Sequence, residues 1–166
     1  MGDEVDAIIA AWVRERPDLD VAPVGVVSRI ARLAARFSQA LELNFEGHGL
    51  TKADFEALAA LRRSGSPFRL SQSRLMQELS LTPGTVSVRI ARLVERGYVE
   101  RLADQDDRRG VIVGLLPAGE RAFEDVVHDH LATERRLLAA LDPGEQDLLA
   151  GLLRRLLTAE TPGASP

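Results

Sequence analysis

The 166-residue sequence contains no cysteine. Without cysteine there are no disulfide bonds, no thiolate metal sites and no thiol-based sensing of oxidants. No apolar run approaches the roughly 20 residues that a helix needs to cross a bilayer, so we expect no membrane partner. The opening residues, Met-Gly-Asp-Glu, are acidic where a secretory signal would be basic. These absences together predict a cytoplasmic protein.

Motifs for catalysis are missing as well. The sequence has no nucleophile elbow, zinc-binding motif or glycine-rich phosphate loop. His128 and His130 are two residues apart and would point in different directions on a helix. We therefore expect no enzymatic activity and no cofactor. A metal-sensing regulator that uses His128 or His130 with Asp129 or Glu134 stays open as an alternative.

The net charge of -4 is distributed unevenly along the chain. Residues 1–56 carry 6 basic and 10 acidic side chains, residues 57–109 carry 10 and 6, and residues 110–166 carry 5 and 9. The middle segment therefore has a net charge of +4, and each flanking segment has -4. This distribution is expected when one part of a chain meets phosphates and the rest does not.

Hydrophobic periodicity predicts helices in the N-terminal third. Apolar side chains recur with helical spacing near the start of the chain: Val5, Ile8, Ile9, Trp12 and Val13. A second helix is predicted from about Pro23 to about Glu46. A third begins after Thr51, which is a natural N-cap, with Asp54 placed to complete a capping box.

Two short helices and a hairpin follow. Ser71 caps a short helix, and Thr82 and Pro83 open the next one after a tight turn. Helices joined by so brief a turn form a helix-turn-helix. Strand-forming residues at 98–102 and 111–115, on either side of a polar loop, then predict a β-hairpin, which in this position is a wing.

The C-terminal region is predicted to be helical from about Pro117 to Leu141, and again after the cap at Asp142. The last helix carries a wide leucine stripe: Leu148, Leu149, Leu152, Leu153, Leu156 and Leu157. A small domain does not easily bury such a stripe alone, so a homodimer is expected, with packing against the first two helices as the alternative. Two reading helices one DNA turn apart would then require a palindromic operator.

The predicted fold class is mainly α with a small β-hairpin wing, that is, a winged helix-turn-helix with a helical dimerisation region. Residues 1–50 form the N-terminal dimerisation helices and a ligand cleft, and residues 51–116 the DNA-binding lobe. Residues 117–160 form the C-terminal dimerisation helices, and 161–166 a flexible tail. The partners expected are double-stranded DNA, a second copy of the chain and a small anion.

The second helix of the helix-turn-helix is the candidate reading helix. Its apolar stripe must face the core and consists of Val86, Ile90, Leu93 and Val94. Thr85, Val88 and Arg92 therefore point away from the core. Small polar and methyl groups can approach base edges. The candidate DNA-binding residues are Ser71, Thr82, Pro83, Gly84, Thr85, Ser87, Val88, Arg92, Arg108 and Arg109. An ordinary amphipathic helix with solvated arginines is the competing interpretation.

The wing loop presents Arg108 and Arg109 beside two aspartates. An arginine at a loop tip can enter the narrow, electronegative minor groove while an aspartate holds its neighbour in place. A solvated, self-neutralising charge cluster is the alternative.

Three motifs resemble the MarR family of bacterial regulators: LVERGYVER at 93–101, DDRRGV at 106–111 and LLPAG at 115–119. The resemblance covers nearly the whole chain and the order of its helices. It implies a dimer built by the outer helices, a reading helix in the major groove and a wing arginine in the minor groove. One departure is Leu116, where the family usually has a threonine cap, a loss that costs about 1 kcal/mol.

The extra N-terminal helix and segment 15–20 resemble the urate-responsive, PecS-type branch of that family. This resemblance implies an anion site formed by Trp12, Glu56, Arg89 and Arg101. Arginines suit a planar anion and a carboxylate accepts a ring N–H, while Arg89 lies on the flank of its helix and not on the DNA face. The branch typically has aspartate where this chain has Glu56.

The expected function is a repressor that a small aromatic or purine-like anion, such as urate, releases from its operator; a phenolic carboxylate is the nearest substitute. Each of the four residues also has a simpler interpretation. Trp12 would then be a core residue, Glu56 and Arg101 solvated surface, and Arg89 a phosphate contact.

Overall fold

The computed structural model describes residues 2–104 and 110–159. In chain order the elements are α1 (Glu4–Glu15), α2 (Ala22–Gly47), α3 (Lys52–Arg63), β1 (Arg69–Ser71), α4 (Gln72–Glu78), α5 (Pro83–Glu95), β2 (Val99–Ala103), β3 (Val111–Leu115), α6 (Pro117–Leu137) and α7 (Pro143–Thr158). No helix in these two ranges is long and apolar enough to cross a membrane.

The helices begin where side chains satisfy their first backbone N–H groups. Thr51 and Asp54 form the predicted capping box of α3, and Asp142 and Glu145 form one at α7. Thr82 caps α5, with Pro83 in the first turn. α6 has no side-chain cap, as the leucine at its N-cap position predicted. Local capping chemistry therefore sets most of the element boundaries.

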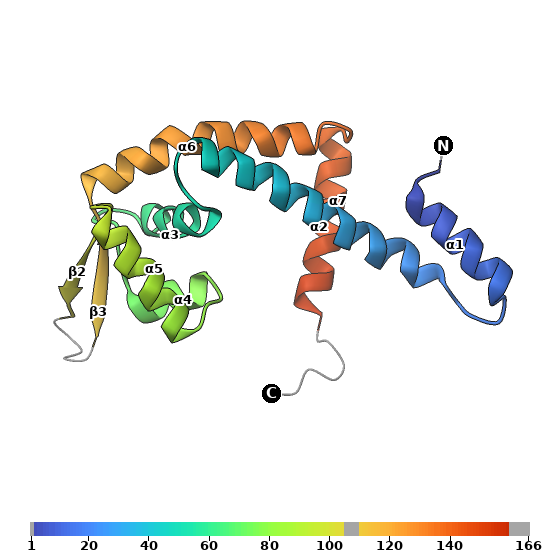
Figure 1. Cartoon of the computed structure of the whole chain (residues 1–166), viewed down its shortest axis with the longest axis horizontal. Coiled ribbons are helices and arrows are strands. Elements are labelled where there is room, and N and C mark those ends of the chain that lie inside the picture. The colour runs from blue at the N-terminus through green and yellow to red at the C-terminus, as the bar shows by residue number, and fades with distance from the viewer. Residues whose placement is uncertain (1, 105–109, 160–166) are drawn as a thin grey trace.

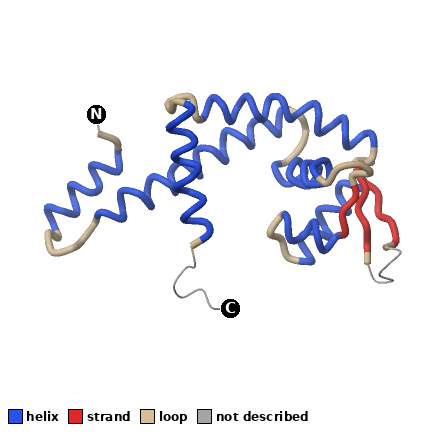
Figure 2. The backbone as a smooth tube through the Cα atoms, turned by 180° about the vertical axis from the view of Figure 1, so that it is seen from behind, coloured by secondary structure: helices blue, strands red, loops and turns tan. Residues whose placement is uncertain are grey.

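The two longest helices, α2 and α6, pack against each other and run in opposite directions (Figure 1). At one end of this pair lies a lobe that contains α3, α4, α5 and the strands. α1 packs against α2 at the opposite end of the molecule. α7 follows the C-terminal end of α6 and points away from it, near the middle of the molecule's long axis (Figure 2). The lobe and the outer helices thus lie in different parts of the molecule (Figure 1).

The sheet has three antiparallel strands in the order β1-β3-β2. The hairpin pairs Val99 with Leu115 and Ala103 with Val111, so the first strand of the wing lies one residue later than predicted. The sequence analysis missed β1, which pairs Ser71 with Ile112. A strand of three residues is too short to show alternation, and its partner lies far along the chain.

The hydrophobic core lies almost entirely in the lobe. Its buried residues are Phe45, Leu50, Phe55, Ala57, Leu58, Ala59, Ala60, Leu61, Leu75, Val86, Ile90, Leu93, Val99, Val113 and Val126. Stacked rings continue the core toward α6, because His130 lies 5.4 Å from the Phe45 ring and 4.7 Å from the Phe55 ring. α1 has one buried residue, Val5, and α7 has none. The outer helices therefore depend on surfaces outside this core.

Two boundaries differ from the sequence analysis. α6 ends at Leu137, where helix to about Leu141 was expected, because a turn precedes the strong start signal at Asp142. Val94, expected in the apolar stripe of the reading helix, is 39% exposed. The buried stripe of α5 is therefore narrower, consisting of Val86, Ile90 and Leu93.

Candidate nucleic-acid interface

α5 is fixed to the lobe by one face and exposes the other. Val86 and Ile90 are fully buried, whereas Val88, between them in sequence, is 73% exposed. The exposed face of α5 is therefore available to a partner of the lobe.

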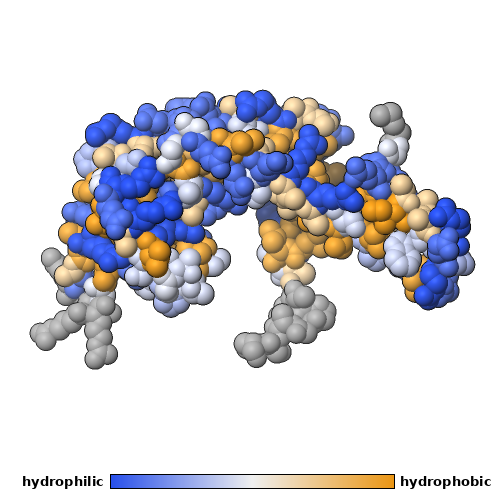
Figure 3. Space-filling model, in the orientation of Figure 1, coloured by the Kyte–Doolittle hydropathy of each residue, from blue (hydrophilic) through white to orange (hydrophobic). Residues whose placement is uncertain are grey.

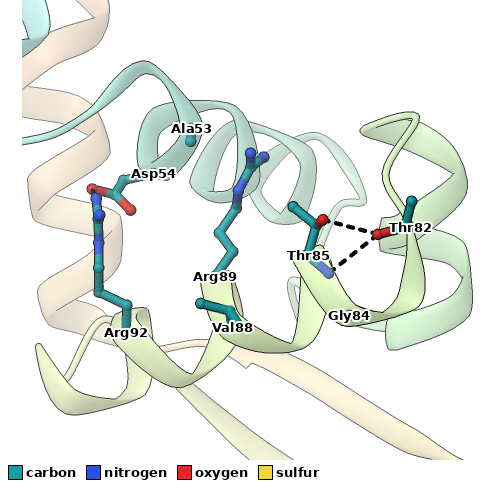
Figure 4. Close-up of a pocket in the computed structure, with 8 residues that line it drawn as sticks. All are labelled: Ala53, Asp54, Thr82, Gly84, Thr85, Val88, Arg89 and Arg92. Carbon is teal, nitrogen blue, oxygen red and sulfur yellow. Dashed lines mark hydrogen bonds and ion pairs between the residues drawn. The ribbon is translucent and has the colours of Figure 1, made fainter.

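The N-terminal turn of α5 presents small polar groups beside Val88 (Figure 4). The hydroxyl groups of Thr82 and Thr85 are 2.8 Å apart, and the Thr82 hydroxyl oxygen also accepts from the Thr85 backbone N–H. Pro83 and Gly84 are exposed on the same turn. This end of the helix offers hydroxyl and methyl groups without bulky side chains, which suits approach to base edges.

Two further candidate residues lie beside this turn. Ser71 caps α4, where its hydroxyl oxygen accepts from the Arg74 backbone N–H. Ser87 is half-buried on α5. Ser71 and Pro83 line a hollow of about 340 Å³ together with Gly110 at the base of the wing. The wing residues Arg108 and Arg109 lie outside the described residues.

Arg92 differs from its predicted role. The sequence places it on the outer face of α5, but its guanidinium turns back onto Asp54 of α3 (Figure 4). Arg92 Nη2 donates to the Asp54 carboxylate, and it also donates to the Thr51 hydroxyl oxygen at a distance of 2.8 Å. Helical periodicity gives the direction of a side chain at its base, but a long side chain can fold back to a buried charge.

Asp54 is the buried centre of this network. Its side chain is 1% exposed, and Arg96 approaches the same carboxylate oxygen at 3.5 Å. Arg96 also lies over the Tyr98 ring, with its guanidinium carbon 4.7 Å from the centroid. Burial alone would raise the pKa of Asp54, but the hydrogen bonds from Arg92 and Thr51 outweigh burial and hold the pKa below its ordinary value.

The predicted anion-site residues are only partly brought together. Glu56 on α3 and Arg89 on α5 form an ion pair, with Oε2 and Nη1 3.8 Å apart. The Arg89 side chain is 15% exposed, and its Nη1 is buried without a hydrogen bond among the described residues. Such a guanidinium is under-satisfied, because a buried cation needs several acceptors.

Arg89 lines a groove of about 580 Å³ between α3 and the N-terminal half of α5 (Figure 4). The other residues around it are Ala53, Asp54, Thr82, Gly84, Thr85, Val88 and Arg92. The groove thus borders the candidate DNA-contacting turn on one side and the Asp54 network on the other.

Arg101 and Trp12 lie elsewhere. Arg101 on β2 donates from Nη2 to the Ser87 carbonyl, 3.0 Å away, and does not line the groove of Arg89. Trp12 is 47% exposed on α1, at the opposite end of the molecule from α5 (Figure 1). One chain therefore does not assemble the four predicted ligand residues.

Two of the three histidines each lie beside an acidic side chain. His130 Nε2 lies 3.2 Å from Glu134, and His48 Nε2 lies 3.1 Å from Asp129. Within 2–104 and 110–159 there is no group of three or more histidine and acidic side chains placed to hold a metal ion. His130 and Glu134, which the metal-sensing alternative named, therefore meet as a pair, but the described residues add no third ligand to them.

Apolar side chains gather on the outer helices. In the space-filling view, hydrophobic colour is concentrated over α7 and where α1 meets α2 (Figure 3). All six leucines of the α7 stripe are exposed, from 36% at Leu149 to 87% at Leu157. Exposure of this extent along one helix marks an interaction surface.

A helix-turn-helix followed by a hairpin, with an anchored second helix that exposes its outer face, defines a winged helix-turn-helix protein. The family model described as "MarR family" matches residues 48–110. The regulator PecS of Dickeya dadantii, described as an HTH-type transcriptional regulator, is 34% identical over 153 residues, which cover 92% of each chain. The chain belongs to the MarR family and is a DNA-binding transcriptional regulator.

Solved structures of the same fold include complexes. A mutant MarR of E. coli in complex with operator DNA is 27% identical, with a TM-score of 0.72 over 82% of this chain and 95% of that one. BpsR of Bordetella bronchiseptica is also 27% identical, with a TM-score of 0.72 over 80% of this chain and 93% of that one. That structure is described as a mechanism for the regulation of DNA binding by 6-hydroxynicotinic acid.

Proposed function

We propose that this chain is a homodimeric repressor that binds a palindromic operator and is released from it by a small aromatic or purine-like anion. The observation that carries the proposal is the division of α5 into a buried stripe and an outer face on which Val88 is 73% exposed. A helix held in this way can enter the major groove without disturbing the core.

In the proposed complex, Thr85 and Val88 approach base edges, with their methyl groups suited to thymine. Ser71, Thr82, Pro83, Gly84 and Ser87 surround them and contact phosphates or sugars, which fixes the register of the helix. Arg108 and Arg109 enter the minor groove from the wing. Arg92, the remaining candidate from the sequence, is bound to Asp54 in the free protein.

A second copy of the chain accounts for the exposed outer helices. The single chain exposes 11659 Å². A compact monomer of 18.1 kDa would expose about 8,100 Å². Two chains together have about 7,200 Å² of such excess, which is enough for the roughly 2,000–5,000 Å² that an obligate dimer covers over both partners. The leucines of α7 and the apolar residues where α1 meets α2 form the interface in this proposal.

The proposed effector site is centred on Arg89. Its buried Nη1 has no hydrogen-bond acceptor in the part of the chain that the structure describes, and an anionic oxygen would supply one. Glu56 can accept an N–H from a heterocyclic ring, as urate would offer. The BpsR structure, described with an aromatic acid that regulates DNA binding, supports this chemical class. Urate is the first ligand to test, and a phenolic carboxylate the second.

The proposed site also includes Trp12, but within one chain α1 lies at the opposite end of the molecule from Arg89 on α5. We propose that a dimer brings α1 of one subunit to the cleft of the other, so that the indole packs on the effector. Arg101 would join the site by releasing the Ser87 carbonyl. We propose no enzymatic activity, cofactor or metal, and we place the regulator in the cytoplasm with its DNA.

The test is an operator-binding titration with palindromic DNA from the promoter region, repeated at several salt concentrations and with urate, salicylate or 6-hydroxynicotinate. We expect the affinity to fall steeply with salt, because lysine and arginine contacts release counterions. We also expect one of the anions to release the DNA and to raise the melting temperature of the free protein. A chain that forms no operator complex at low salt would contradict the proposal.

A further inference from the structure

The C-terminal half of α5 is tied to the start of α3 by one carboxylate. Asp54 accepts from Arg92, and Arg96 Nη1 is 3.5 Å from the same oxygen. Arg96 also donates from Nη2 to the Gly49 carbonyl, 2.8 Å away. Both arginines of this half of the helix are therefore bound to the loop and helix behind it.

The carboxylate is itself held in place. Asp54 Oδ2 accepts from the Thr51 backbone N–H at 3.1 Å, and the Thr51 hydroxyl oxygen accepts from the Asp54 backbone N–H at 3.2 Å. Because this reciprocal cap fixes Asp54, the carboxylate cannot follow Arg92 toward a DNA phosphate. If Arg92 left, Asp54 would keep the Thr51 hydrogen bond, but its nearest cation would be Arg96 at 3.5 Å, which is costly for a buried charge.

We propose that Asp54 is a specificity-determining residue, which acts by withholding Arg92 from the DNA backbone. This inference rests on the proposed binding of DNA through α5. Arg92 follows Val88 by one helical turn on the same face, and its side chain is 48% exposed. Without Asp54, its guanidinium would be free to extend toward the phosphates that flank the groove.

Withholding one arginine favours sequence discrimination. Phosphate contacts bind every DNA sequence alike, whereas base contacts bind only the operator. Each phosphate that a protein neutralises adds about 0.9 to the slope of log affinity against log salt. Asp54 thus lowers the affinity for unrelated DNA and leaves the N-terminal turn of α5 as the part that reads sequence.

The test is a salt titration of operator and unrelated duplex DNA with the full-length protein and two variants. Asp54→Asn keeps an oxygen for the Thr51 cap but removes the charge that holds Arg92. A dimer carries two copies of Arg92, so we expect its slope on unrelated DNA to steepen by about 0.9 per subunit, or about 1.8 in all. Its affinity for that DNA should rise several-fold at low salt. Arg92→Gln should leave both slopes unchanged, because the wild-type side chain contacts Asp54 and no phosphate.

Glu95→Gln is the matched control, since it also removes one negative charge from this region. Glu95 is exposed at the end of α5 and forms no ion pair with a described residue, so its loss should change the slope less. In the double variant Asp54→Asn/Arg92→Gln the steepening should disappear, which a purely structural role of Asp54 would not produce.

Two results would overturn the inference. One is a slope that becomes shallower by about 0.9 per subunit, or about 1.8 for the dimer, in Arg92→Gln, which would make Arg92 a phosphate contact in the wild type. The other is an unchanged slope in Asp54→Asn. Either result with normal operator binding by the wild type refutes this inference alone, whereas a wild type that binds no operator refutes the proposed function.

Discussion

Trp12 belongs to α1 and Arg89 to α5, two helices that lie at opposite ends of the molecule (Figure 1). The two residues offer complementary interactions to a planar anion, because an indole provides a stacking surface and a guanidinium provides paired hydrogen-bond donors. A site that uses both must take them from two chains. The effector response is then a property of the dimer and not of either subunit.

Mixed dimers test this arrangement. Trp12→Ala and Arg89→Gln should each abolish release from the operator while leaving operator affinity within about threefold, as neither residue lies on the DNA face. When the two variants are mixed and allowed to exchange subunits, about one quarter of the sites regain both wild-type residues. Isothermal titration with the effector should detect this fraction.

The matched controls are each variant alone at the same total concentration. No recovery in a mixture that demonstrably exchanges subunits would show that each site is built within one chain.

An acid titration should release α1 before the lobe unfolds. Arg29 of α2 binds both carboxylate oxygens of Asp3, each at 2.8 Å. These hydrogen bonds lower the pKa of Asp3 to about 2. Because the folded pKa lies below the ordinary value, the stabilisation is complete above about pH 4 and is lost as the pH falls toward 2.

Trp12 is the single tryptophan of the chain, so its fluorescence reports on α1. The emission should shift across that acid window, and Asp3→Asn should move the emission at neutral pH toward the released value. Glu15→Gln is the control, because Glu15 pairs with Arg14 on the same helix and not with α2. Identical titration curves for the wild type and Asp3→Asn would contradict the assignment.

Gly119 is the position most sensitive to an added methyl group. A Cβ there would lie 2.2 Å from the Tyr98 carbonyl oxygen, at the junction between the wing and α6. Gly119→Ala should therefore destabilise the protein by about 1–3 kcal/mol, as overpacking does. Thermal or urea unfolding measures this change.

Gly151→Ala provides the comparison. Gly151 lies in α7 with nothing within 4 Å of an added Cβ, and alanine is the better helix former by about 1 kcal/mol. This variant should be neutral or more stable. Equal destabilisation by both substitutions would indicate a general effect of the added methyl group and not the contact with Tyr98.

The sequence was sufficient to predict those features of the fold that depend on residues close together in the chain. Thr51, Thr82 and Asp142 begin helices at the predicted positions because a cap is read within three residues. β1 was missed because its stability comes from pairing with distant β3. Periodicity also gave the flank position of Arg89, since the angle around a helix depends only on local spacing.

Long-range pairing limits the prediction of the site. Asp54 was recognised as a cap, but its contact with Arg92, 38 residues further along the chain, requires the packing of α3 on α5. No pattern within either helix contains that information. The same holds for Trp12, whose distance from Arg89 follows from the length and direction of α2.

The main buried cluster contains only residues between Phe45 and Val126. This has a consequence for how the amount of active regulator depends on the expression level of its gene. α7 has no buried residue, so in the proposed dimer the outer helices are completed only when two chains meet. At low abundance the amount of dimer varies with the square of the chain concentration, and halving expression leaves about one quarter of the operator-competent form. Weak changes in synthesis or turnover would thus produce steep changes in promoter occupancy, without any effector.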